Sequence, residues 1–294
     1  MAIADPWQGI GRRDSVAGGG PGLPVVVFEQ VRKQLTGLCR RGTRLADAAV
    51  AAALAPACLS CAEVLDRPTR SAVCDRCWRN LRLYVPPLCA TCGAPGSSPA
   101  PGGLVPSPSR ARCPGCDGIA LPDGVTSLRA IGPYEGVLRD LVHALKYERR
   151  RSLAALLAPL LGIVAADVLC GADAVVPVPL HPWRQWQRGF NQAALLAAML
   201  PSPQAPVLRR ARATAPQADL DAGQRQANVR DAFVLAGRTA LGRARSAARV
   251  RGRVLVLVDD VLTTGATLGA CAGVLRRAGA REVRALTIAR VYWA

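Results

Sequence analysis

The pattern of apolar and polar positions changes near residue 124. After this point, apolar runs of strand length alternate with segments whose apolar residues recur at helical spacing. Strands that alternate with helices predict an α/β fold built on a parallel sheet. The expected strands cover 127–132, 174–180, 254–258 and 283–288, and the expected helices cover 137–161, 191–200 and 267–278.

The first 123 residues show no such alternation. Residues 1–24 are rich in Gly, Pro and charge, which predicts a flexible tail, and good helix formers predict a helical lead-in at 25–57. Residues 58–123 contain few apolar residues, many Gly and Pro, and a low-complexity loop at 93–109. We therefore expect a cysteine-rich module at 58–123 followed by an α/β domain at 124–294, which fits a chain of 294 residues.

Eight of the 11 cysteines form four Cys-x-x-Cys pairs within 59 residues. This spacing lets two thiolates reach one tetrahedral ion, so it favours zinc over iron–sulfur clusters or disulfides. Eight thiolates make two sites of four sulfurs, and their pairing is open: either first with second and third with fourth, or interleaved. The expected Zn²⁺ ligands are Cys58, Cys61, Cys74, Cys77, Cys89, Cys92, Cys113 and Cys116.

Both zinc sites are expected to be structural. A four-sulfur site has no open position for a reactant, and the only two histidines, His143 and His181, lie outside the cluster. Metal binding would then supply much of the module's folding free energy. Reduced thiolates, an N-terminal segment without the apolar core of an export signal, and no apolar run of about 20 residues predict a cytoplasmic protein without a transmembrane segment.

The chain carries 38 basic and 20 acidic residues, a formal charge of +18, and only Lys33 and Lys146 are lysines. Most of the excess lies at 124–294, with 24 basic against 11 acidic residues. Arginine pairs with phosphate through two parallel hydrogen bonds, so the composition points to phosphate-bearing partners. A coding bias toward Arg and Ala explains much of the excess equally well.

The most specific motif for chemistry is VLVLVDDVLTTGATLGAC at 254–271. A buried strand is expected to deliver Asp259 and Asp260 at its carboxyl end, and a short loop then leads into a helix. Backbone N–H groups at such a helix start favour an anion, and the hydroxyl groups add donors. The loop residues are Thr263, Thr264, Gly265, Ala266 and Thr267. The plainer interpretation is a capped turn beside a solvated acid pair.

This motif resembles the phosphoribosyl pyrophosphate signature of type I phosphoribosyltransferases. The whole of 58–291 looks like the ComF (competence protein F) family, which joins a cysteine-rich zinc ribbon to a phosphoribosyltransferase-like domain. The loop before Cys113 and about the first 50 residues look specific to this chain and not part of the family pattern. The other matching motifs are YEG at 134–136, HALKY at 143–147, VPVPLHPWR at 176–184, RGFNQ at 188–192, PQADL at 216–220, Arg225, and NVRDAF at 228–233.

The resemblance implies a site for phosphoribosyl pyrophosphate bound with Mg²⁺. Asp259 and Asp260 would be the catalytic residues, holding the ribose 2′- and 3′-hydroxyls and favouring positive charge at the anomeric carbon. The loop at 263–267 would hold the 5′-phosphate, and Arg184 or Arg188 the pyrophosphate, which an acceptor nitrogen would displace. Nothing in the sequence identifies the acceptor.

Further candidate residues carry alternatives. Gln217, Arg225, Asn228 and Arg230 lie where such transferases have a flap that closes over the site, although a plain surface loop is the other interpretation. Lys146 could contact phosphate or extend its stem along a helix. Asn191 could belong to the site or be a helix N-cap, and Phe190 is expected in the core.

Two functions compete. The first is an active phosphoribosyltransferase that also handles incoming single-stranded DNA in natural transformation, with the DNA-uptake machinery at the inner membrane face as a partner. The alternative is a non-catalytic module that binds single-stranded nucleic acid and reuses the phosphate pocket. Aromatic residues make up only 4% of the chain, which limits base stacking. The candidate stacking residues are Trp78, Tyr147, Trp183 and Trp186.

Overall fold

The computed structural model describes the cysteine-rich module in part and most of the α/β domain. The described residues are 55–68, 71–85, 88–95, 113, 116, 121–211, 232–237 and 239–291. The expected tail at 1–24, almost all of the lead-in at 25–57, most of the loop at 93–109 and the flap residues lie outside them. The division into these parts stays a prediction.

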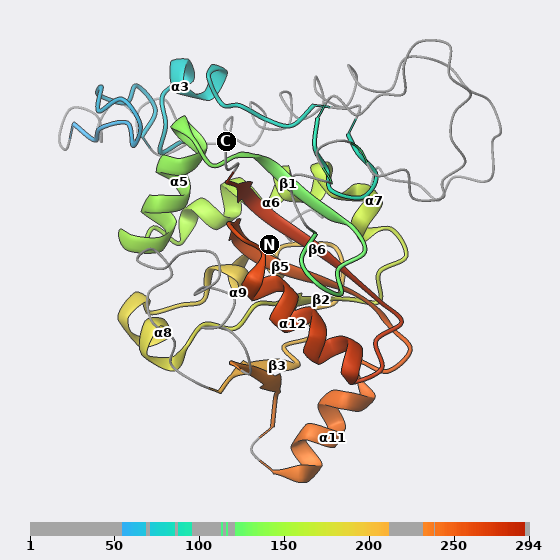
Figure 1. Cartoon of the computed structure of the whole chain (residues 1–294). Coiled ribbons are helices and arrows are strands. Elements are labelled where there is room, and N and C mark those ends of the chain that lie inside the picture. The colour runs from blue at the N-terminus through green and yellow to red at the C-terminus, as the bar shows by residue number, and fades with distance from the viewer. Residues whose placement is uncertain are drawn as a thin grey trace, which may run out of the picture.

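A four-stranded parallel sheet forms the centre of the molecule (Figure 1). Its order is β1 (Leu128–Pro133), β6 (Glu282–Arg290), β5 (Val254–Leu262) and β2 (Ala174–Pro177). Residues 254–258 are fully buried, as expected for a strand covered on both faces. The structure thus confirms the predicted α/β fold with a parallel sheet.

Alternate residues of β5 enter two different apolar cores. Val256 and Val258 pack with α5 (Gly136–Tyr147), α6 (Ser152–Val164) and α9 (Gln192–Ala197). The other core is formed against α12 and the small antiparallel sheet. Its elements are α12 (Ala266–Arg277), β3 (Leu208–Arg210) and β4 (Phe233–Leu235). This two-residue period is the one that a strand imposes on its side chains, and it fixes which face of β5 each later residue occupies.

The remaining helices are short or lie at the surface. α3 (Asp75–Arg79) lies in the cysteine-rich module, and α7 (Ala166–Leu169) follows α6. α8 (Pro182–Arg188) and α11 (Ala240–Ala248) have no buried residue. Neither was predicted from the apolar pattern, since neither buries an apolar face.

The single helix predicted at 137–161 is wrong. The chain forms α5 and α6, separated at 148–151, where Arg149 has a φ of 57°. This break holds one Glu and three consecutive Arg, which offer no apolar side chain to the core. Their charge favours an exposed turn over a continuous helix.

The cysteine-rich module lies along the outer edge of β1. The Tyr84 N–H donates to the Ile131 carbonyl at 2.8 Å, and the Leu128 N–H donates to the Thr91 carbonyl at 2.8 Å. A Cβ added at Gly132 would lie 2.3 Å from the Arg82 carbonyl oxygen. Glycine at 132 therefore permits a close backbone approach between the module and the sheet.

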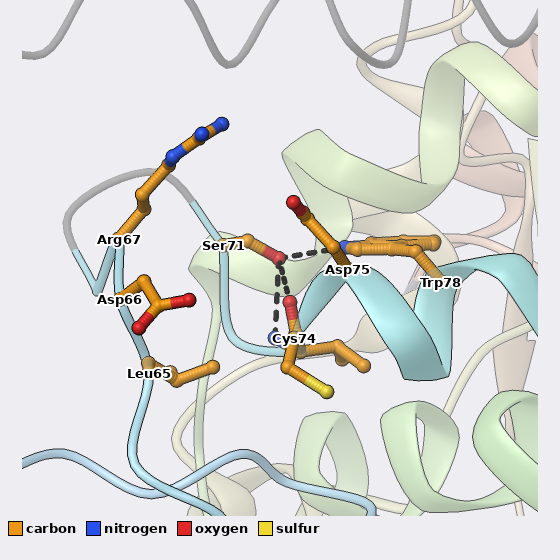
Figure 2. Close-up of a pocket in the computed structure, with 8 residues that line it drawn as sticks. Leu65, Asp66, Arg67, Ser71, Cys74, Asp75 and Trp78 are labelled. Atoms are coloured by element: carbon orange, nitrogen blue, oxygen red, sulfur yellow. Dashed lines mark hydrogen bonds between the residues drawn. The ribbon is translucent and has the colours of Figure 1, made fainter.

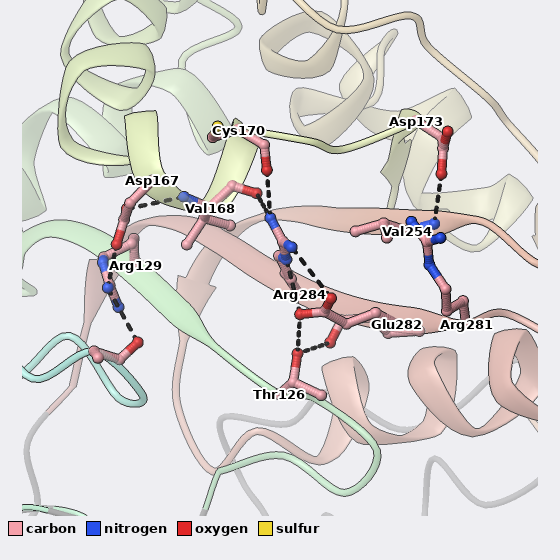
Figure 3. Close-up of polar contacts among 12 residues, drawn as sticks. Thr126, Arg129, Asp167, Val168, Cys170, Asp173, Val254, Arg281, Glu282 and Arg284 are labelled. Atoms are coloured by element: carbon pink, nitrogen blue, oxygen red, sulfur yellow. Dashed lines mark hydrogen bonds and ion pairs between the residues drawn. The ribbon is translucent and has the colours of Figure 1, made fainter. Parts of the chain in front are cut away.

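Two arginines, buried Arg129 and half-buried Arg284, connect helix α7 and the second half of the module to the sheet (Figure 3). Arg129 donates to the Ala90 carbonyl at 3.1 Å and forms an ion pair with Asp167 of α7. Arg284 donates to the carbonyls of Val168 and Cys170 at 2.9 and 2.7 Å. These bonds satisfy carbonyls at a helix end, which would otherwise lack partners.

Candidate active site and metal centres

An acid pair, Asp259 and Asp260, lies near the carboxyl end of strand β5. The Asp260 N–H donates to Asp259 Oδ1 at 2.8 Å, which fixes the first carboxylate against the second residue's backbone. Lys146, in the last turn of α5, places Nζ 2.8 Å from Asp260 Oδ1. Both side chains of this ion pair are largely shielded from solvent, at 16% and 13% exposure. Lys146 therefore contacts the acid pair, which neither sequence interpretation stated.

The surroundings of the acid pair change the pKa values of Asp259 and Lys146. Burial and the adjacent charge of Asp260 raise the pKa of Asp259 to about 7, although the Asp260 N–H and the charges of Lys146 and Arg210 oppose this rise. Burial alone would lower the pKa of Lys146, but the charges of Asp260 and Asp259 outweigh it and raise that pKa. The site thus holds the Lys146–Asp260 ion pair beside the Asp259 carboxyl, whose pKa lies near neutrality.

The loop after β5 has the geometry that its glycine predicts. Gly265 has a φ of 78°, and a Cβ there would lie 2.9 Å from Pro122 Cγ. The Thr264 hydroxyl accepts a bond from the Ala266 N–H at 3.5 Å, and α12 begins at Ala266. The loop at 263–267 therefore passes directly into a helix start, where backbone N–H groups attract an anion.

Arg210 lies close enough to Asp259 and to Arg184 for their charges to act on it, and Arg184 and Arg188 are the predicted pyrophosphate ligands. Arg184 and Arg188 of α8 are half-buried, and the Arg188 guanidinium lies 5.2 Å from the centre of the Tyr147 ring. Arg210 of β3 is buried, with its guanidinium 5.3 Å from the centre of the Phe233 ring. Burial and then the charge of Arg184 lower its pKa, while the charge of Asp259 opposes this.

Sequence analysis missed Arg210. The available signal was its place in a short strand, where Leu208 and Arg210 are buried on either side of an exposed Arg209. An arginine at an inward position next to the expected flap is a candidate for the pocket. Arg225 and the other flap residues lie outside the described residues and stay predictions.

The RGFNQ segment supports the pocket structurally. Asn191 caps α9, since its Oδ1 accepts bonds from the N–H groups of Ala193 and Ala194 at 3.0 and 3.4 Å. Its Nδ2 donates to the Val178 carbonyl at 3.0 Å, which ties the helix start to the end of β2. Phe190 is buried under the Arg151 guanidinium. The N-cap interpretation of Asn191 and the core placement of Phe190 are confirmed.

The eight cysteines gather into two groups of four, each with its Sγ atoms within 4.8 Å of one another. The first two Cys-x-x-Cys pairs form one group and the last two form the other, so the pairing is sequential and not interleaved. The Sγ atoms of Cys61 and Cys74 are 3.6 Å apart, and those of Cys89 and Cys116 are 3.7 Å apart. Zn–S bonds of about 2.3 Å in a tetrahedron place sulfurs about 3.8 Å apart, so each group could hold such an ion.

Backbone hydrogen bonds prepare one thiol in each group to ionise. Burial opposes the ionisation of Cys89, but N–H groups of the surrounding backbone outweigh burial and lower its pKa to about 6. The same balance lowers the pKa of Cys58 to about 7. Thiolates are the form that binds metal, so this geometry favours a metal ligand over a neutral core cysteine.

The first group, called cluster 1 (Cys58, Cys61, Cys74 and Cys77), is part of the main apolar core. Cys58 and Cys77 pack in the core that contains α5, and the Ser60 hydroxyl donates to Asp140 Oδ2 of α5 at 2.7 Å. The second group, cluster 2 (Cys89, Cys92, Cys113 and Cys116), forms a separate small core. Cluster 1 therefore packs directly against α5, the helix that carries Lys146.

A small pocket adjoins cluster 1, and Figure 2 shows its polar lining. The Trp78 Nε1–H donates to Ser71 Oγ at 2.7 Å, and the Ser71 hydroxyl donates to the Val73 carbonyl at 2.7 Å. Trp78 also packs against the main core. Trp78 is therefore partly buried beside cluster 1, and its role as a stacking residue stays a prediction.

Among the described residues, no helix combines the length and the apolar character that crossing a bilayer requires.

Comparison with known proteins agrees with this architecture. Residues 204–291 match the phosphoribosyl transferase domain family. The DNA utilization protein YhgH of Salmonella typhimurium is 35% identical over 228 residues, covering 74% of this chain and 90% of its own. YhgH of Escherichia coli K12 is 33% identical over 229 residues, with 74% and 89% covered. Competence protein F of Haemophilus influenzae is 29% identical over 232 residues, with 75% and 91% covered. The chain, with two four-cysteine clusters ahead of a phosphoribosyl transferase domain, therefore belongs to the ComF family that includes the YhgH proteins.

Proposed function

We propose that this protein binds phosphoribosyl pyrophosphate as its Mg²⁺ complex and transfers the phosphoribosyl group to an acceptor nitrogen, with release of pyrophosphate. The observation that carries the proposal is the acid pair held by Lys146 directly before the loop at 263–267 and the start of α12. An anion site next to two hydroxyl acceptors matches a phosphorylated ribose.

In this proposal the loop at 263–267 binds the 5′-phosphate, while Asp259 and Asp260 accept hydrogen bonds from the ribose hydroxyls. Their negative charge stabilises positive charge that develops at the anomeric carbon when pyrophosphate leaves. Lys146 holds the Asp260 carboxylate in place before the donor arrives. Arg184 and Arg188 of α8, with Arg210 of β3, supply cations for the pyrophosphate.

The residues of this pocket fit Mg²⁺ held mainly by the donor. Among the described residues, the groups of three or more potential metal ligands are the two cysteine clusters, and the acid pair supplies only two carboxylates. Mg²⁺ commonly binds through one or two carboxylates together with substrate phosphates. When bound, it would neutralise charge on the departing pyrophosphate.

We propose, second, that the protein handles incoming single-stranded DNA during natural transformation, in the cytoplasm beside the DNA-uptake machinery at the inner membrane face. Its relatives include proteins named for DNA utilization and competence. The formal charge of +18 supports a polyanionic partner. If transfer to an acceptor does not occur, the same pocket would serve a non-catalytic module that binds a strand through phosphate.

Neutralising the acid pair tests the donor site. We expect Asp259→Asn and Asp260→Asn each to weaken donor binding by about 10–150-fold, because a hydrogen bond to a charged acceptor contributes about 1.5–3 kcal/mol. Titration calorimetry with phosphoribosyl pyrophosphate and Mg²⁺ measures this. Asp173→Asn is the matched control, since Asp173 lies at the opposite end of the sheet, where its Oδ2 accepts a bond from the Val254 N–H at 2.7 Å. Unchanged affinity in both pocket variants would refute the site.

The raised pKa of Asp259 predicts a pH dependence of stability. The unfolded carboxyl releases its proton near its ordinary pKa, whereas the folded one holds it until about pH 7. The folded state therefore binds more protons in this window, and its free energy of unfolding falls as pH rises from about 4 to 7. Asp259→Asn should remove this fall, as measured by urea unfolding at pH 5 and pH 8. An identical pH slope in the variant and the parent protein would contradict the assignment.

Zinc in both clusters is tested by counting metal. We expect two Zn²⁺ per chain in the parent protein. Either Cys58→Ser or Cys89→Ser should leave one Zn²⁺, because each substitution removes one of the four ligands of one cluster. Cys170→Ser is the control, since Cys170 is an exposed thiol outside both clusters. Elemental analysis of the purified variants gives the counts. Iron in place of zinc, or loss of both ions from one substitution at Cys89, would count against two independent zinc sites.

A further inference from the structure

Helix α8 exposes two tryptophans that do not contribute to a buried core. None of its seven residues is buried, and the Trp183 and Trp186 side chains are 61% and 73% exposed. Their rings stack, with centroids 5.1 Å apart and planes 28° from parallel. Leaving this much apolar area in water is unfavourable, and exposed apolar patches commonly mark binding surfaces.

The helix is nevertheless firmly constructed. His181 Nδ1 accepts a bond from the Trp183 N–H at 3.2 Å, Pro182 begins the helix, and Gly189 ends it with a φ of 78°. From the break between α5 and α6, Arg151 donates to the Gly189 carbonyl at 2.6 Å, and Arg149 donates to the Gln187 carbonyl. The tryptophans are therefore presented on a fixed support.

A third exposed aromatic ring lies at the end of α5. Tyr147 is 62% exposed, with the Arg188 guanidinium 5.2 Å from its ring centre and the His143 ring 4.8 Å away. Tyr147 directly follows Lys146, whose Nζ contacts Asp260. We call the exposed rings of Tyr147, Trp183 and Trp186 the aromatic surface; Arg188 of α8 connects Tyr147 to the helix that carries the tryptophans.

The two segments that carry the aromatic surface are mostly basic, although Lys146 is paired with Asp260 of β5. Glu148 is the one acidic residue in 143–151 and 181–189, and it pairs with Arg150 at 3.1 Å. Each residue of an α-helix is rotated by about 100° from the one before it. This rotation places Trp183 and Trp186 on one side of α8 and Arg184 and Arg188 on another. The basic residues of these segments are Lys146, Arg149, Arg150, Arg151, Arg184 and Arg188.

We propose that the aromatic surface stacks the unpaired bases of single-stranded DNA while the neighbouring arginines contact the strand's phosphates. This inference rests on the proposed DNA role and assigns its location. Aromatic rings beside basic residues are the combination by which proteins bind a single strand without reading its sequence. Duplex DNA does not offer its base faces, and a second copy of this positive surface would be repelled.

The test compares two fluorescein-labelled 20-mers, oligothymidine and an abasic strand with the same phosphates, by anisotropy over a salt series. The double variant W183A/W186A should bind oligothymidine at least about tenfold more weakly, since stacking on an aromatic ring is sequence-tolerant and substantial. Its affinity for the abasic strand should not change. W183F/W186F should restore binding, and R188A should weaken both strands and reduce the salt slope by about 1.

A matched control comes from α11, another helix without buried residues. Leu241 is 62% exposed there, so L241A removes apolar surface of the same kind, and R245A removes an exposed arginine of that helix. Neither should alter binding. Because the α8 side chains lie in solvent, the melting temperature of W183A/W186A should match that of the parent protein.

The remaining outcomes separate the two levels of the proposal. If the parent protein prefers oligothymidine over the abasic strand and W183A/W186A keeps that preference, the location is wrong while the DNA role stands. If the parent protein binds both strands equally, stacking is refuted. If it binds neither, the DNA role fails as well. If W183A/W186A instead converts a dimer to a monomer in sedimentation, the tryptophans form a contact between copies, which also overturns the proposal.

Discussion

The ion pair between Lys146 and Asp260 is the interaction on which the arrangement of the pocket depends. A strand buried on both faces delivers two adjacent carboxylates, and such a pair needs a cation nearby to stay even partly ionised. The cation comes from the last turn of α5, so α5 must lie with that turn over the end of β5. Cluster 1 packs on the same helix. The cysteine-rich module, α5 and the acid pair thus form one continuous structure.

The net positive charge of the chain does not explain anion binding at the acid pair. The charge of +18 is spread along the chain, whereas the centre of the pocket holds two acids and one lysine. Affinity for a ribose phosphate there would come from backbone N–H groups and local hydrogen bonds. Arg184 and Arg188 lie on α8, the helix whose tryptophans are exposed. Under the two proposals, the pyrophosphate of the donor and the phosphates of a DNA strand would share these arginines, while the ribose and its 5′-phosphate would meet the acid pair and the loop at 263–267.

The sequence predicts those features that are local. The apolar run of β5, the glycine with positive φ at 265 and the helix after it follow from a dozen consecutive residues, and the structure has them as expected. The pairing of the cysteine knuckles could not be predicted, because spacing alone permits either arrangement. The partner of Lys146 and the burial of Arg210 depend on how distant elements pack. The break at 148–151 was missed because the apolar residues on both sides keep helical spacing.

The most direct test of the account is a crystal structure of the protein with Mg²⁺ and phosphoribosyl pyrophosphate. The account predicts the 5′-phosphate against the loop at 263–267, the ribose hydroxyls on Asp259 and Asp260, and Lys146 still paired with Asp260. A donor bound with its phosphate away from this loop, or an empty pocket at a saturating donor concentration, would contradict the central claim.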